Sequence, residues 1–320
     1  MRRAGGRLIC GRSSRRLAES SVTARSPLAL LSIVVCALIW GTTWYAITLQ
    51  FGSVEPLVSI VWRFGLAAVV LFLFCLATRR SLKLTGAQHL AALGQGAFAF
   101  SLSYSFTYEA EHHVASAIVA VMFAALTFIN LVLFRLAAGQ KAHAASWTGA
   151  ILGVVGVAVL SGGEVAGAGF GGEATLGIAL ALIATTASAF GNYFAWRGQN
   201  AGSAVIPSTA WAMAYGTGLL VLYGLATGVE WSIEPTARYI GSLLYLSLFG
   251  SVIAFGLYFS LARNVGYAMA SYISALTPPI AMLVSVVFED ARFGWPAAVG
   301  LVLVLSGQGL LIRAAQAKAA

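Results

Sequence analysis

Apolar residues fall into ten long runs along this chain, and short polar connectors separate the runs. An α-helix needs roughly 20 apolar residues to cross the hydrocarbon core of a bilayer, and most of these runs approach that length. The pattern therefore predicts an all-α polytopic membrane protein with ten transmembrane helices, which lie near residues 28–49, 56–77, 87–107, 114–134, 145–161, 174–196, 207–228, 239–260, 267–288 and 295–312.

The composition agrees with this prediction and excludes a soluble domain. Of the 320 residues, 59% are hydrophobic and 9% are charged, whereas a soluble domain carries about 25% charged residues. Such a low share of charge cannot cover a surface that faces water. The three cysteines show neither a disulfide framework nor the spacing of a zinc site.

The charges in the connectors predict the orientation of the chain. The N-terminal segment, the even-numbered connectors and the C-terminus hold 16 of the 19 Lys and Arg residues, and the odd-numbered connectors hold nine of the ten acidic residues. Basic connectors stay on the cytoplasmic side of a membrane. We therefore expect an integral protein of a bacterial inner membrane with both termini in the cytoplasm. The net charge of +9 is explained by this orientation, so the expected surroundings are a lipid bilayer and no nucleic acid.

The first 27 residues are rich in Arg and Ser and contain one acidic residue, Glu19. We interpret them as a basic cytoplasmic tail. A mitochondrial transit peptide has a similar composition and remains the alternative.

The two halves of the chain resemble each other at an offset of about 150 residues. Residues 37–44 align with 187–194, residues 59–62 align with 208–211, and the glycine pair Gly149 and Gly156 aligns with Gly300 and Gly307. Each repeat, 28–162 and 174–313, holds five predicted helices. Because five is odd, the second repeat enters the membrane from the opposite side. The prediction is two inverted five-helix repeats, an arrangement typical of secondary transporters.

Several segments make the chain similar to the EamA family of the drug/metabolite transporter superfamily. They are Leu38–Ala46, Pro56–Phe64, Ala270–Ala281, Phe288–Asp290, and the glycines Gly300 and Gly307. The resemblance implies export or import of small metabolites, often amino acids or related compounds. Together with the inverted repeats it predicts a secondary transporter of small organic metabolites that works by alternating access, and more specifically an exporter. The first repeat departs from the family pattern, with Ala125 near the position equivalent to Pro278 and Gln140 in place of an acidic residue. A non-transporting membrane assembly subunit is the alternative function.

Arg63 is the sharpest candidate for substrate binding. It follows Glu55 by eight residues, which is roughly 12 Å of helix at 1.5 Å per residue. A guanidinium inside a membrane is costly and usually faces a cavity. Arg63 can hold a carboxylate through two parallel hydrogen bonds, although a purely structural partner is the alternative.

Aromatic and polar residues within the apolar runs are further candidates for the lining of a substrate cavity. Trp40 and Trp44 share a helix face because they are four residues apart, as do Asn192 and Trp196. Pro278 and Pro279 interrupt the ninth run and are candidates for a hinge, with a static kink as the alternative. The remaining substrate-binding candidates are Thr43, Tyr258 and Tyr272.

The third connector contains a cluster of titratable residues: Glu109, Glu111, His112 and His113. We interpret it as a solvated loop, with proton coupling or metal binding as the alternatives.

No P-loop and no His-Glu-x-x-His motif occurs, and a Gly-x-Gly-x-x-Gly stretch at 167–172 follows a predicted membrane helix rather than a strand. We therefore expect no cofactor, no resident metal and no enzymatic activity. Gly149 and Gly153 permit close helix approach, either within the chain or in a homodimer.

Overall fold

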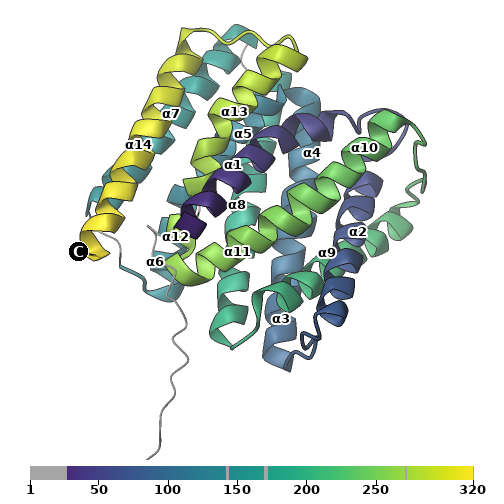
Figure 1. The fold of residues 1–320 in the computed structure, drawn as a ribbon. Coiled ribbons are helices and arrows are strands. Elements are labelled where there is room, and N and C mark those ends of the chain that lie inside the picture. The colour runs from purple at the N-terminus through teal and green to yellow at the C-terminus, as the bar shows by residue number, and fades with distance from the viewer. Residues whose placement is uncertain (1–26, 142–143, 169–171, 271, 320) are drawn as a thin grey trace, which may run out of the picture.

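The computed structural model describes residues 27–141, 144–168, 172–270 and 272–319, and every regular element within them is helical (Figure 1). The predicted basic tail lies outside the described residues except for its last one. The first half of the chain contains α1 (Pro27–Thr48), α2 (Pro56–Ala77), α3 (Gly86–Gln95), the π-helix η1 (Gly96–Leu102), α4 (Ser103–His113), α5 (Ser116–Phe123), α6 (Leu126–Ala138) and α7 (Ala144–Ala168).

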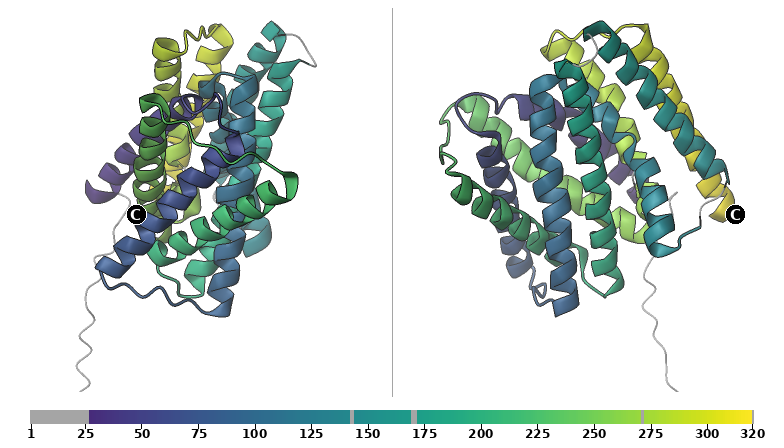
Figure 2. Two further views of the ribbon diagram at one scale, coloured as in Figure 1. Left: turned by 90° about the vertical axis from the view of Figure 1, so that its right-hand side faces the viewer. Right: turned by 180° about the vertical axis from the view of Figure 1, so that it is seen from behind.

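The second half repeats this order of elements. It contains α8 (Glu173–Asn200), α9 (Val205–Thr227), α10 (Ala237–Tyr245), the π-helix η2 (Leu246–Ile253), α11 (Ala254–Val265), α12 (Tyr267–Ala270), α13 (Tyr272–Phe288) and α14 (Trp295–Ala319). The start of α1 and the end of α14 lie at the same height in Figures 1 and 2.

The described helices have the length and surface of membrane spans. Seven helical segments are long and apolar enough to cross a bilayer, and shorter apolar helices cover Leu276–Phe288 and Trp295–Leu310. Large apolar side chains such as Leu73, Leu76 and Val302 are exposed. Hydrocarbon solvates such a surface and water does not. The chain is therefore a polytopic helical membrane protein.

The two π-helices occupy matching places in the two halves. Helices α3, η1 and α4 follow one another without a break, and so do α10, η2 and α11. Thr85 starts the first of these stretches and Thr236 the second, and the hydroxyl of each accepts a hydrogen bond from a backbone N–H of the first turn. π-Helices are rare, and those inserted in α-helices are frequently found at functional sites.

Helices α7 and α14 pack against each other along their length at one side of the molecule (Figures 1 and 2). Gly156 contacts Gly300 and Gly149 contacts Gly307, so the two helices run antiparallel. A Cβ atom on Gly307 would lie only 2.4 Å from the carbonyl oxygen of Gly149. Glycine is required here because no side chain fits between the two backbones.

The other helices surround the centre of the molecule. Helix α1 packs on α11 and α13, α8 packs on α4, and α2 packs on α9. Phe64, Phe100 and Phe259 belong to the largest hydrophobic cluster and are almost completely buried. This packing brings helices from both halves of the chain around one internal space.

Candidate functional site

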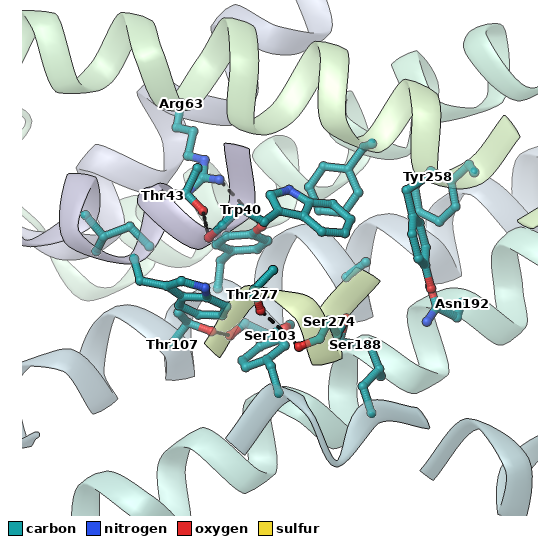
Figure 3. Close-up of a pocket in the computed structure, with 18 residues that line it drawn as sticks. Trp40, Thr43, Arg63, Ser103, Thr107, Ser188, Asn192, Tyr258, Ser274 and Thr277 are labelled. Atoms are coloured by element: carbon teal, nitrogen blue, oxygen red, sulfur yellow. Dashed lines mark hydrogen bonds between the residues drawn. The ribbon is translucent and has the colours of Figure 1, made fainter. Parts of the chain in front are cut away.

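A cavity lies between the two halves of the chain (Figure 3). Helices α1, α2, α4, α5, α6, α8, α11 and α13 and the π-helix η1 contribute its walls. Its lining is mostly aromatic and hydroxyl-bearing, and Arg63 is its one charged residue among the described positions. The lining residues are Trp40, Thr43, Trp44, Ile47, Arg63, Ala99, Ser103, Tyr104, Thr107, Phe123, Leu126, Ser188, Asn192, Phe255, Tyr258, Phe259, Ser274 and Thr277.

The guanidinium of Arg63 is held at the cavity wall by neutral groups. The residue is 1% exposed. Its Nε donates to Ser251 Oγ at 3.1 Å, and its Nη2 lies 3.5 Å from Tyr104 Oη. The Tyr108 hydroxyl also influences the guanidinium electrostatically. The Nη1 atom of Arg63 has no hydrogen-bond acceptor. Among the described residues no carboxylate forms an ion pair with Arg63, so its charge is left uncompensated by a hydrogen-bonded anion.

The π-helix η2 supplies the groups that orient Arg63 and Trp40. Ser251 accepts the hydrogen bond from Arg63 and donates its own to the carbonyl oxygen of Leu246 at 2.9 Å. The indole Nε1 of Trp40 donates to the carbonyl oxygen of Gly250 at 3.1 Å. In a π-helix the hydrogen bonds join residues five apart instead of four, and the Gly250 carbonyl of this π-helix faces α1.

Aromatic rings form two walls of the cavity. Trp40 packs against Phe255 and Tyr258 with ring centroids 5.2 and 5.3 Å apart. Trp44 packs against Phe123 at 4.9 Å. Tilted and edge-to-face contacts of this kind stabilise ring positions, so these walls are preformed.

Polar groups lie at the end of the cavity away from Arg63. The Tyr258 hydroxyl points towards Asn192 in Figure 3, and the Asn192 side-chain amide reaches Asn130 Oδ1 at 3.5 Å.

In α13, Pro278 has no N–H to donate to the carbonyl of Ser274, four residues earlier. The Thr277 hydroxyl donates to this carbonyl instead, at 2.9 Å.

The structure places most, but not all, of the predicted site residues at this cavity. Six line it, and they are Trp40, Thr43, Trp44, Arg63, Asn192 and Tyr258. Trp196 is not among the lining residues, and its ring packs on Tyr193 and Phe134. The side chain of Tyr272 lies outside the described residues. Pro278 and Pro279 lie inside α13 beside Thr277 without lining the cavity.

Sequence reasoning missed the hydroxyl groups of α4 and α13. Ser103, Tyr104 and Thr107 line the cavity from α4, and Ser274 and Thr277 do so from α13. The spacing of Ser103 and Thr107, four residues apart within an apolar run, is the signal for a shared helix face.

The titratable cluster at the end of α4 is only partly a solvated loop. Glu109 and His112 are exposed as predicted, but Glu111 is 6% exposed. His113 is hydrogen-bonded to Glu173 and lies 3.4 Å from Glu109. The hydrogen bond to Glu173 raises the pKa of His113 above its usual value. No three His, Cys, Asp or Glu side chains of the described chain gather as metal ligands.

Comparison with known proteins gives the family. Residues 27–162 and 175–313 match the EamA-like transporter family. The chain is 30% identical over 253 residues to the "Uncharacterized inner membrane transporter YedA" of Escherichia coli (strain K12), covering 77% of this chain and 78% of that protein. It is 24% identical over 288 residues to the "Probable amino-acid metabolite efflux pump" of the same strain, covering 88% and 92%.

A crystal structure shares the fold, with a TM-score of 0.68 at 18% identity over 91% of this chain and 98% of the other. The family match covers nearly all of the described helices, and the two relatives are named as a transporter and as a probable efflux pump. This chain, a polytopic helical membrane protein, therefore belongs to the EamA-like transporter family.

Proposed function

We propose that this protein is a secondary transporter that exports small organic metabolites bearing a carboxylate, such as amino acids or related compounds, and that it performs no enzymatic reaction. The observation that carries the proposal is Arg63: a buried guanidinium that lines the cavity and has no carboxylate bound to it within the described chain. A relative is named "Probable amino-acid metabolite efflux pump", which favours export of such a compound.

The cavity suits a compound with one acidic group and an apolar body. A buried cation is costly unless an anion compensates it, and a substrate carboxylate is such an anion. The fork of a guanidinium matches the two oxygens of a carboxylate. The tryptophan walls at Trp40 and Trp44 provide apolar contact for the remainder of the molecule, while Asn192 and Tyr258 offer polar partners at the far end.

The proposed mechanism is alternating access between two inverted five-helix repeats. We infer ten spans, in which α3–η1–α4, α5–α6, α10–η2–α11 and α12–α13 each form one, and both termini in the cytoplasm. Two observations support the inversion: α7 and α14, the last spans of the two repeats, run antiparallel, and π-helices begin at Gly96 and Leu246, 150 residues apart. Inverted repeats of this kind rock around a site near the midplane.

The test is transport by purified protein in lipid vesicles. Vesicles are loaded with mixtures of amino acids and other small carboxylates, and release of each compound is measured with and without a proton gradient. We expect release of at least one carboxylate. If no compound crosses the membrane and a stoichiometric partner copurifies, the protein is an assembly subunit instead.

The site is tested with the transported compound. Arg63→Lys keeps the charge but loses the planar fork, so transport efficiency is expected to fall at least about tenfold, which corresponds to roughly 1.4 kcal/mol. Trp44→Ala removes part of an aromatic wall and is expected to weaken binding. Arg238→Ala, at an exposed position in the first turn of α10, is the matched control. Normal transport by Arg63→Ala, with release of the compound by wild type, overturns the site but not the function.

A further inference from the structure

Glu111 is buried and has no hydrogen-bond partner. It is 6% exposed, and both of its carboxylate oxygens are inaccessible and unpartnered. Glu289, the carboxylate whose charge acts on Glu111, is different because it accepts hydrogen bonds from the hydroxyls of Ser116, at 2.7 Å, and Ser285. An ionised carboxylate in such surroundings costs far more than a neutral one. Glu111 is therefore the group in this region that is best suited to hold a proton.

We propose that Glu111 is the proton-binding site of this transporter, and that a proton on Glu111 and an anion at Arg63 bind together. The proposal rests on the transport function proposed above. It assigns a coupling ion to the protein and a role to a residue that does not line the substrate cavity.

The link between the two groups runs along one face of α4. Tyr104, Tyr108 and Glu111 follow each other at intervals of four and three residues, so they share that face. Tyr104 and Tyr108 both interact electrostatically with Arg63. The Tyr108 hydroxyl donates a hydrogen bond to Gln50 Oε1 at 2.8 Å. Thr107, one turn before Glu111, lines the cavity.

Two charged groups influence the charge state of Glu111 electrostatically: Arg63 in α2, and Glu289, the residue that follows α13. Arg63 favours an ionised Glu111, whereas Glu289 and burial favour the protonated form. On α4 itself, the exposed Glu109 and the histidines His112 and His113 lie at the end nearest the connector. Glu109 and His112 are exposed, so protonatable side chains that reach water lie at the same end of α4 as Glu111.

The sign of the coupling follows from these charges. An anion at Arg63 compensates the guanidinium, so Arg63 stabilises an ionised Glu111 less and the protonated form of Glu111 is favoured further. Conversely, a protonated Glu111 leaves Arg63 free for the anion, because coupling between two sites is reciprocal. Substrate and proton therefore travel in the same direction, and export of the metabolite carries one proton with it.

The first test needs no substrate. Infrared spectra of purified protein at neutral pH report the carbonyl stretch of protonated carboxylic acids. We expect this band in wild type and in Glu109→Gln, whose side chain is exposed, and its loss in Glu111→Gln. Size-exclusion profiles check that each variant is folded, and Glu111→Asp, which keeps an acid, is expected to keep a band. A band that persists in Glu111→Gln, or none in wild type, overturns the proposal.

The second test uses a carboxylate that wild type transports. Its apparent affinity is expected to rise as pH falls through the range in which Glu111 becomes protonated, by up to about tenfold per pH unit for one coupled proton, and to level off once Glu111 is protonated. A dye inside the vesicles is expected to report proton movement with the substrate. Glu111→Gln is expected to keep exchange of labelled for unlabelled compound but to lose the pH dependence and the proton movement. Unchanged proton movement in Glu111→Gln refutes the coupling. Failure of wild type to transport any compound refutes the proposed function alone, because the infrared result stands independently.

Discussion

Gly156 in α7 and Gly300 in α14 are reciprocal neighbours: a Cβ atom built on either one would lie 2.6 Å from the carbonyl oxygen of the other. Backbone atoms form this contact on both sides, so a flexible side chain cannot move away to make room. The pair holds two antiparallel helices in close contact at the side of the molecule away from the α2–α9 pair (Figure 1).

Gly156→Ala is expected to destabilise the protein. The new methyl group would also lie 2.8 Å from the backbone nitrogen of Val304, so the two helices must separate, at a cost of about 1–3 kcal/mol. Gly162→Ala, in the same helix, has no neighbour within 4 Å and gains helix propensity of up to about 1 kcal/mol. Thermal unfolding in detergent is expected to give a lower midpoint for the first variant only, and equal midpoints contradict the packing argument.

Gly250→Ala is expected to impair substrate binding without preventing membrane insertion. Its Cβ would lie 2.9 Å from Thr43 Cγ2 and 3.4 Å from Nη2 of Arg63, so both groups must shift at the cavity wall. We expect a loss of about tenfold in apparent affinity for a transported carboxylate, or roughly 1.4 kcal/mol. Gly241→Ala in α10 meets nothing within 4 Å and serves as control; an equal loss there argues against a specific effect.

Thr277→Val is expected to weaken the proline-containing segment of α13. The substitution keeps the shape of the side chain but removes the hydroxyl that binds the carbonyl of Ser274. An unsatisfied buried carbonyl costs about 1–3 kcal/mol, and a lower unfolding midpoint together with reduced transport is expected. Thr277→Ser keeps the hydroxyl and is expected to behave like wild type. If both variants transport normally, the hydrogen bond has no role in the transport cycle.

The pairing of His113 with Glu173 is expected to make stability depend on pH. The pKa of His113 is raised in the folded state, so its contribution is fully present below the ordinary histidine pKa of about 6.5. The contribution is lost as pH rises through the raised value. His113→Gln is therefore expected to lower the unfolding midpoint at acidic pH and to change it little at alkaline pH. Glu173→Gln is expected to give the same pattern, and a uniform shift at every pH contradicts the ion pair.

Sequence reasoning selected a residue that lines the cavity where that residue stands out chemically from its surroundings. A guanidinium inside an apolar run is rare enough that Arg63 is identified without any knowledge of its neighbours. Trp196 shows the opposite case. It shares a helix face with Asn192 in the sequence, yet one turn further along α8 that face packs on Phe134 rather than on the cavity.

Glu111 shows why the end of a span is difficult to place from composition. The apolar run ends near residue 107, but α4 continues to His113, and α5 and α8 pack against it. Burial of the last turn depends on these helices, which are distant in sequence or follow a turn. The polar residues Glu111, His112 and His113 therefore indicate a connector in the sequence, whereas in the structure the packed helices enclose the carboxylate of Glu111.

The sequence by itself determined that this chain is a helical membrane protein, because runs of apolar residues can be satisfied in a bilayer only as hydrogen-bonded helices. It also identified the family resemblance and singled out Arg63. Only the tertiary structure decided which side chains surround Arg63, where the π-helices place Ser251 and Gly250, and that Glu111 is buried. Such contacts join helices far apart in the chain, and the local periodicity of a sequence contains no information about which helices become neighbours.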